Sequence, residues 1–341
     1  MNWRNSSRSI GVVAALAVLL PGLAACGAGS ADAGNAGKVT LSLVAYSTPQ
    51  LAYEKIIKAY QATPEGQNVT FTKSFGASGD QSRAVEAGLK ADIVAFSLEP
   101  DVTRLVKAGL VADDWNTDAT KGIVTDSVVV IGTREGNPKG IKTWDDLVKP
   151  GTEVITANPF TSGGARWNLL AGYGATSGKG KDSKAGLDYL GKLLKNVPVQ
   201  DDSARKSLQT FLGGKGDAIL AYENEAIFAK QSKQKLDYTL PDDTILIENP
   251  IAVTRNSAHP KEAKAFLKFL HSATAQKIFV ENGYRPTTDG IPGADQFPTP
   301  SGLFTIEDLG GWSKVNEEFF DTEKGKVADI ERKLGVSVEK K

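Results

Sequence analysis

The stretch VTLSLVAYSTPQLAYEKIIKAY (residues 39–60) decides the fold class, because an apolar strand is followed at once by an amphipathic helix. Residues 39–44 form the strand candidate, and apolar side chains then recur at helical spacing at Tyr53, Ile56, Ile57 and Tyr60. The same pattern continues, with strands predicted at 69–71 and 93–96 and helices at 80–89 and 102–108. This alternation predicts an α/β domain with a mainly parallel sheet.

A second α/β unit follows the β-branched run SVVVIG at residues 127–132. Its predicted strands are 154–155 and 218–221, and its predicted helices are 164–170, 184–194 and 203–212. Residues 245–253 are predicted to be extended and broken by Pro250, and helices are predicted after them at 261–270, 273–281 and 313–334. We infer that the chain leaves the first unit near Thr125 and returns near Pro250. This predicts one lobe of residues 38–125 plus 251–341, a second lobe of residues 126–250, and a cleft between them.

The start of the chain is typical of an export signal. Arg4 and Arg8 precede an apolar stretch at residues 10–20, which is too short to span a bilayer. The run Leu-Ala-Ala-Cys at 23–26 resembles the lipobox of bacterial lipoproteins, and Cys26 is the one cysteine of the 341 residues. We therefore expect a signal peptide at 1–25, a lipid on Cys26, and a flexible Gly/Ala/Ser-rich tether at 26–37. An ordinary secretory signal with a chance cysteine is the alternative.

Composition narrows the function further. The sequence has 40 basic and 40 acidic residues, so no basic surplus points to a nucleic-acid partner. The two histidines, His259 and His271, have no metal-ligand spacing, and residues 213–216 lack the pattern of a phosphate-binding P-loop. We expect no metal and no cofactor, and we expect a monomer outside the cytoplasm, held at the cell membrane by its lipid.

Three loops share one design, in which Gly and Ser residues join the end of a strand or extended piece to the start of a helix. They lie at residues 75–79, 159–164 and 202–205. Free N–H groups at a helix start carry a partial positive charge and bind anions without a Lys or Arg side chain. In open α/β sheets, ligands bind at the carboxyl ends of the strands. The three loops therefore predict one small oxyanion held between them.

The same three loops argue against an enzymatic function. The run Gly76 to Asp80 differs from a nucleophile elbow, which needs a Gly two places after the Ser, and no loop of this kind contains a histidine base. We expect no catalytic residue. A surface hydrolase that uses Ser78 or Ser162 remains the alternative from another functional class.

Four blocks of sequence resemble the periplasmic sulfate-binding proteins of ABC importers. They are SFGASGDQ at 74–81, NPFTSGGARWN at 158–168, AYENEA at 221–226 and YRP at 284–286. The resemblance implies a two-lobed periplasmic-binding-protein fold of type II, with a mainly parallel sheet flanked by helices in each lobe. It also implies a desolvated sulfate in the cleft and an ABC permease that receives it. Thiosulfate, another tetrahedral oxyanion and a small organic acid remain alternative ligands.

Matching the motifs residue by residue implies the ligand donors Ser47, Ser78, Ser162, Gly163, Gly164, Ala204 and Tyr222. Ser162 would give its hydroxyl, and the others mainly backbone N–H groups. Three positions depart from the family pattern: Ser47 replaces a usual Asp, Tyr222 replaces a usual Trp, and Asp80 replaces a usual Lys. A tyrosine hydroxyl can donate at a different reach from an indole N–H. Arg205 matches a family arginine without a required contact to the anion.

Overall fold

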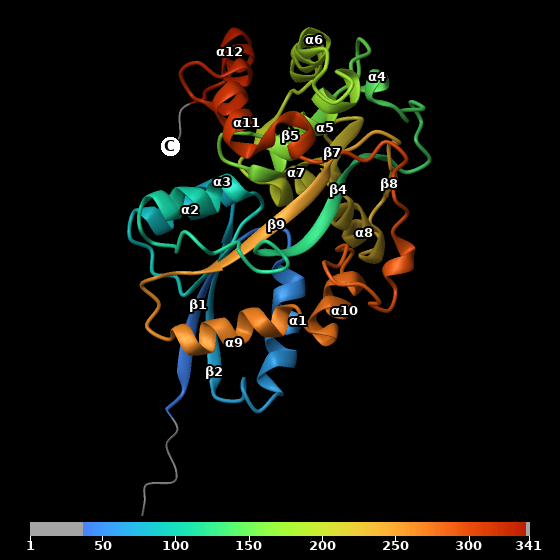
Figure 1. Cartoon of the computed structure of the whole chain (residues 1–341). Coiled ribbons are helices and arrows are strands. Elements are labelled where there is room, and N and C mark those ends of the chain that lie inside the picture. The colour runs from blue at the N-terminus through green and yellow to red at the C-terminus, as the bar shows by residue number, and fades with distance from the viewer. Residues whose placement is uncertain (1–36, 339–341) are drawn as a thin grey trace, which may run out of the picture. The chain divides into compact units, whose positions relative to one another are not determined.

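The strands of residues 37–338, the part of the chain that the computed structural model describes, form one mixed sheet with helices packed on its faces (Figure 1). The strand order is β2-β1-β3-β9-β4-β7-β5-β6, and β8 pairs with β4. In chain order the strands and α-helices are β1 (Val39–Tyr46), α1 (Gln50–Gln61), β2 (Val69–Gly76), α2 (Ser78–Glu86), β3 (Ile93–Ala95), α3 (Glu99–Lys107), β4 (Ile123–Arg134), α4 (Trp144–Leu147), β5 (Val154–Ala157), α5 (Gly163–Thr176), α6 (Ser183–Lys195), β6 (Gln200–Asp201), α7 (Ala204–Leu212), β7 (Ala218–Tyr222), α8 (Glu223–Gln231), β8 (Leu236–Thr239), β9 (Leu246–Val253), α9 (Pro260–Leu270), α10 (Ala273–Glu281), α11 (Gly311–Phe320) and α12 (Lys326–Lys333).

The α/β class predicted from the sequence is confirmed. Strand β1 pairs in parallel with β2 and β3, and β5 pairs in parallel with β6 and β7, as strand–helix–strand units require. The long strands β4 and β9 pair antiparallel with each other and with their other neighbours β7, β8 and β3. The whole sheet is therefore mixed, because β4 and β9, which cross between its two parallel regions, run antiparallel to each other.

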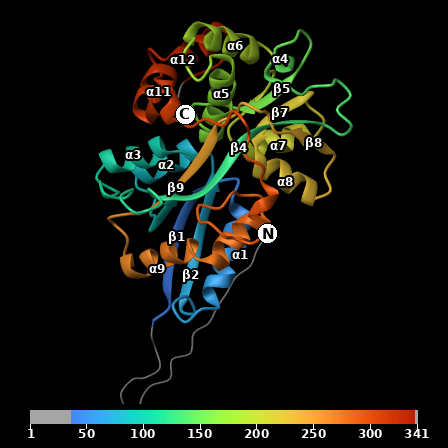
Figure 2. The same ribbon diagram turned by 45° about the vertical axis from the view of Figure 1, so that its right-hand side comes forward.

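The two crossing strands run side by side in both views (Figures 1 and 2). The register pairs Thr125 with Asn249, next to a pairing of Ile123 with Pro250. Proline has no N–H to donate, and the register shifts between Ile123 and Thr125, opposite this site. Strand β9 thus continues through Pro250 instead of ending there. The division into lobes of 38–125 plus 251–341 and of 126–250 stays a prediction.

Helices cover both faces of the sheet. One face of β1 and β3 packs against α1, α9 and α10, with Ile56, Phe266 and Phe279 fully buried or nearly so. The opposite face packs against α2 and α3 through Val85 and Val102. A strand buried on both faces needs apolar side chains in both directions, which explains the nearly continuous apolar run of β1.

The second parallel region is covered in the same way, and the C-terminal helices contribute to it. One apolar core contains Trp167 of α5, Leu190 of α6 and Val315 of α11. Within it, the ring centroids of Trp167 and Trp312 lie 4.7 Å apart. The predicted helical region 313–334 is two helices, α11 and α12, which lie beside α5 and α6 (Figure 2). Strand β8 and helix α8 were not anticipated from the sequence.

The predicted signal peptide at 1–25, Cys26 and all of the predicted tether except Gly37 lie outside the described residues. Within residues 37–338, no helix combines the length and the apolar character needed to cross a membrane.

Candidate functional site

A small cavity lies where the carboxyl ends of the parallel strands meet. It contains about 220 Å³ of space not filled by atoms. Its walls come from the residues that follow β1, β2, β3, β5, β6 and β7, as expected for a ligand site of an open α/β sheet. The lining residues are Tyr46, Ser47, Thr48, Gly76, Ala77, Ser78, Ser97, Ser162, Gly164, Ser203, Ala204 and Tyr222.

Four helices begin at this cavity. Helices α2, α5, α7 and α8 start directly after the lining residues Ala77, Ser162, Ser203 and Tyr222. The first N–H groups of a helix have no partner within it, and their dipoles add to a partial positive charge. The sequence loops predicted the starts of α2, α5 and α7. The sequence did not predict helix α8, although it did predict Tyr222, the residue before it, as a site residue.

The structure brings together six of the seven predicted site residues. Ser47, Ser78, Ser162, Gly164, Ala204 and Tyr222 all line the cavity. Gly163, the first residue of α5, lies behind the wall, where a Cβ atom would be 2.5 Å from Ser97 Oγ. Only glycine therefore permits this close approach of α5 to the chain after β3. Whether these residues bind a ligand stays a prediction.

A buried hydrogen-bond network organises one wall of the cavity. Ser78 Oγ donates to Asp101 Oδ2 at 2.6 Å and accepts from the N–H of Ser97 at 2.9 Å. Ser97 Oγ and Tyr222 Oη share a hydrogen bond of 2.9 Å. The Ser78 side chain is therefore committed to the protein, and its backbone N–H, at the start of α2, is the group that it can offer to a ligand.

No charged side chain is among the lining residues. Arg205 directly follows the lining residue Ala204. Its Nη2 atom donates to the Thr48 carbonyl at 2.8 Å and to Glu225 Oε1 at 2.7 Å. Burial raises the pKa of the Glu225 carboxyl to about 7, against the opposing effect of Arg205. The cavity is therefore electrically neutral in its side chains, and helix ends supply its positive potential.

Hydrogen bonds join the two sides of the cavity. The N–H of Gly79 donates to the carbonyl of Thr161 at 3.0 Å, and Arg83 Nη1 donates to the carbonyl of Phe160 at 3.4 Å. Asp80 pairs with Arg83, so its carboxylate is partly neutralised in this position. These contacts hold the start of α2 against the loop before α5.

Sequence reasoning missed Tyr46, Thr48 and Ser97 as cavity residues. Each lies within a few positions of a strand end, and each carries a hydroxyl. A search of every strand end for polar residues, rather than of Gly/Ser loops alone, would have found them.

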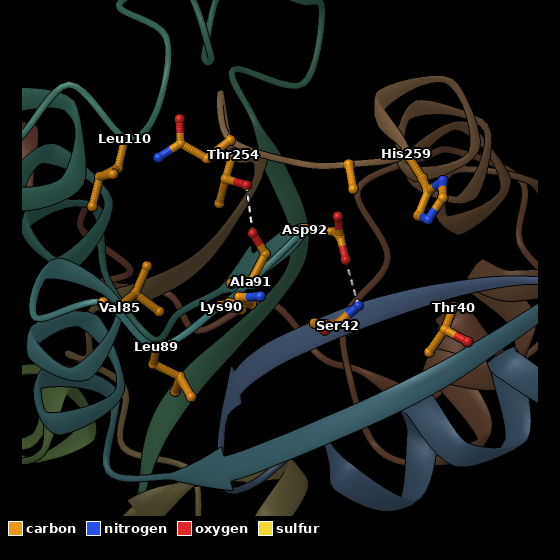
Figure 3. Close-up of a pocket in the computed structure, with 13 residues that line it drawn as sticks. Thr40, Ser42, Val85, Leu89, Lys90, Ala91, Asp92, Leu110, Thr254 and His259 are labelled. Atoms are coloured by element: carbon orange, nitrogen blue, oxygen red, sulfur yellow. Dashed lines mark hydrogen bonds between the residues drawn. The ribbon is translucent and has the colours of Figure 1, made fainter.

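A second pocket, open to solvent, lies at the other end of β1 and β3 (Figure 3). Its carboxylate, Asp92, accepts from the N–H of Ser42 at 2.7 Å and from Ser257 Oγ at 2.6 Å. Lys90 and His259 also line it. Because both carboxylate oxygens already have partners within the fold, Asp92 is explained by its structural role.

Comparison with known proteins agrees with this architecture. Residues 41–285 match the family of bacterial extracellular solute-binding proteins, and the chain belongs to that family. The solved structure of the sulfate-binding protein SubI from Mycobacterium tuberculosis is 45% identical, with a TM-score of 0.81, and the match covers 83% of this chain and 100% of that one. A periplasmic thiamin-binding protein shares the fold at 18% identity, with a TM-score of 0.67 over 82% of this chain and 95% of that one. The type II periplasmic-binding-protein fold is confirmed.

The resemblance to the periplasmic sulfate-binding proteins is confirmed as well. A sulfate-binding protein of Synechococcus elongatus is 43% identical over 314 residues, which cover 87% of this chain and 89% of the relative. A thiosulfate-binding protein of Pseudomonas aeruginosa is 33% identical over 279 residues, covering 79% of this chain and 84% of the relative. These relatives are substrate-binding proteins by name, and neither name describes an enzyme.

Proposed function

We propose that the protein binds sulfate outside the cytoplasm and holds it in the cavity where α2, α5, α7 and α8 begin. The observation that carries the proposal is the convergence of these helix ends on a cavity with no charged side chain in its lining. N–H groups of Ser78, Gly163, Gly164 and Ala204 would stabilise the dianion, with Ser162 Oγ and the N–H of Ser47 as further donors. Charge-assisted hydrogen bonds in a dry site are about twice as strong as neutral ones.

A cavity built from N–H donors favours sulfate over phosphate. Sulfate at neutral pH has no proton and accepts hydrogen bonds in every direction. Phosphate keeps a proton, which needs an acceptor, and an unpaired buried polar group costs about 1–3 kcal/mol. This corresponds to roughly 10- to 100-fold discrimination.

Isothermal calorimetry with sulfate, thiosulfate, molybdate and phosphate tests the proposal. We expect tight sulfate binding, and the relative from Pseudomonas aeruginosa makes thiosulfate the second candidate ligand. Tight phosphate binding without any heat from sulfate would overturn the proposal. A serine-reactive phosphonate tests the hydrolase alternative, and we expect no labelling, because neither histidine is among the lining residues.

We further propose that an ABC permease receives the bound anion. The contacts of Gly79 with Thr161 and of Arg205 with Thr48 would form as the two lobes close on the ligand. The closed surface would then be the one that the permease recognises. Sulfate uptake in cells that lack this protein should fall, and should recover when the gene is restored. Normal uptake in such cells would contradict the role in transport.

We propose that Cys26 carries the lipid that keeps the protein at the cell membrane. The support is the lipobox-like run at 23–26 after a short apolar stretch. Cys26→Ala should move the protein from the membrane fraction to the soluble fraction. A variant that stays in the membrane fraction would disprove the anchor and leave the binding proposal untouched.

A further inference from the structure

Helix α8 differs from the other three helices that begin at the cavity, because its first turn contains two buried carboxylates. Glu223 and Glu225 follow the lining residue Tyr222 closely, and both side chains are almost fully buried. The first turns of α5 and α7 contain no acidic residue. A carboxylate interacts favourably with the partial positive charge of a helix start. An uncompensated carboxylate in this turn would therefore compete with an anionic ligand for the same helix end.

Both carboxylates are paired with arginines from distant parts of the chain. Arg205 pairs with Glu225, and Arg285 pairs with Glu223. In the second pair, Arg285 Nε donates to Glu223 Oε2 at 2.8 Å and Nη2 donates to Oε1 at 3.2 Å. The side chains of Arg285 and Glu223 are 11% and 3% exposed, so the pair is bidentate and shielded from water. The sequence blocks AYENEA and YRP meet in this pair.

Arg285 is fixed by its backbone as well as by its side chain. Its N–H donates to the carbonyl of Asp126 in β4 at 2.9 Å, and the N–H of Asp126 donates back to the carbonyl of Arg285 at 2.9 Å. Arg285 Nη2 also donates to the carbonyl of Pro298 at 2.9 Å. Arg285 is not among the residues that line the cavity, so any effect that it has on a ligand is indirect.

Stability alone does not explain a buried ion pair. Removing two charges from water costs about as much free energy as their attraction returns, so such a pair is weak evidence for stability. Loss of one partner, however, leaves the other as an uncompensated buried charge. Without Arg285 that charge would be the Glu223 carboxylate, one residue from the wall of a cavity that has no charged lining residue. The location of the pair is therefore more informative than its strength.

We infer that Arg285 is a positioning residue for anion binding, which holds and neutralises Glu223 so that the start of α8 keeps its positive potential for the ligand. The inference rests on the proposed function, since the ligand is the dianion proposed for the same cavity. It makes the two halves of one ion pair opposite in their effect on binding.

Arg285→Met should lower sulfate affinity about 10-fold, the size of the effect that one nearby like charge has on an ionic group. Glu223→Gln should instead raise sulfate affinity, because the unpaired guanidinium adds positive charge behind the helix start. The double variant, Arg285→Met with Glu223→Gln, should bind sulfate about as tightly as the wild-type protein. A merely structural pair would lose affinity in either single variant.

Isothermal calorimetry with sulfate and the full chain measures these affinities at mildly alkaline pH. Burial raises the pKa of the Glu223 carboxyl and Arg285 lowers it, so the variant without Arg285 keeps this carboxylate charged only at higher pH. Asp126 also lies beside Arg285, with Glu248 opposite it on β9, and Tyr238 of β8 lies near Glu223. Rescue by Glu223→Gln identifies Glu223, rather than Asp126, as the carboxylate responsible.

Two further variants separate charge from packing. Arg285→Lys keeps the positive charge without the bidentate geometry, and it should retain most of the sulfate affinity lost in Arg285→Met. Arg134→Met is the matched control, because the Arg134 guanidinium donates to the carbonyls of Phe211 and Gly216 and does not line the cavity. It should lower the melting temperature without changing sulfate affinity.

The sign of the Glu223→Gln effect decides the inference. Tighter sulfate binding in this variant supports it, and weaker or unchanged binding overturns it. This measurement stands even where thermal melting shows that Arg285→Met does not fold. Failure of the wild-type protein to bind sulfate would instead remove the proposed function.

Discussion

Thr125 of β4 and Asn249 of β9 face each other across the antiparallel pair, and Thr125 Oγ1 lies 3.3 Å from Asn249 Oδ1. The amide of Asn249 also donates from Nδ2 to the carbonyl of Ser97 at 3.1 Å. Ser97 lines the cavity, so the paired crossing strands are connected to the cavity wall through one side chain. The two points where the sequence predicted the chain to leave and re-enter its first lobe are therefore neighbours in space.

Ser162→Ala should weaken sulfate binding by about 1.5–3 kcal/mol, the range for a lost hydrogen bond to a charged partner. It should also lower the free energy of unfolding by about 1 kcal/mol, because Ser162 caps α5. Calorimetry and urea denaturation measure the two effects. Ser272→Ala is the control, since Ser272 caps α10 in the same way away from the cavity, and it should change stability alone. Equal sulfate affinity in both variants would remove Ser162 from the site.

Gly164→Ala should reduce sulfate affinity by about 1–3 kcal/mol, the usual effect of an overpacked site. The added Cβ would lie 3.3 Å from Ala204 Cβ and 3.5 Å from Tyr222 Cε1, inside the cavity wall. Gly191→Ala, also within a helix, meets no atom within 4 Å and should stabilise the fold by about 0.5–1 kcal/mol without affecting binding. Full sulfate affinity in Gly164→Ala would place the ligand elsewhere.

Asp126→Asn should stabilise the protein above neutral pH by about 1 kcal/mol, because Asp126 lies directly opposite Glu248 in the β4–β9 ladder. Burial, and to a smaller extent the nearby Glu248, raise the pKa of the Asp126 carboxyl to about 7, against the opposing effect of Arg285. In the unfolded chain this pKa is about 4. The stabilisation from protonated Asp126 is thus complete below about pH 4 and is lost as the pH rises through about 7.

Urea denaturation across this pH range checks the Asp126 prediction. The wild-type protein should lose stability as the pH rises, and Asp126→Asn should show a smaller loss. Asp113→Asn, at a largely exposed carboxylate, should follow the wild-type curve. Identical curves for all three proteins would show that Asp126 does not titrate in this range.

Arg205→Met should lower the free energy of unfolding by about 3–5 kcal/mol above pH 7, because it leaves the buried Glu225 carboxylate without its partner. The loss should shrink as the pH falls through the Glu225 pKa of about 7, since the protonated acid has no charge to compensate. Arg205→Met combined with Glu225→Gln should recover most of the loss. A loss that is independent of pH and of the second change would assign the effect to packing, for Arg205 also stacks on Phe228 at 4.3 Å.

Much of the fold and of the cavity was predictable because its signals are local. The 3.6-residue spacing of Tyr53, Ile56 and Tyr60 places α1, and the Gly/Ser loops before residues 80, 164 and 204 place three of the helix starts. Helix α10 was predicted at its observed bounds, residues 273–281. Site residues on these loops were found because a helix start and its capping residues are adjacent in sequence.

Local pattern established the strand–helix order, the positions of the Gly/Ser loops and the scarcity of candidate catalytic groups, since each depends on residues a few positions apart. Tertiary structure decided the antiparallel pairing of β4 with β9, the contact of Gly163 with Ser97, and the Ser78–Asp101 and Ser97–Tyr222 hydrogen bonds. Partners separated by 19 to 125 positions leave no periodic trace in sequence, and only packing of the whole core brings them within bonding distance.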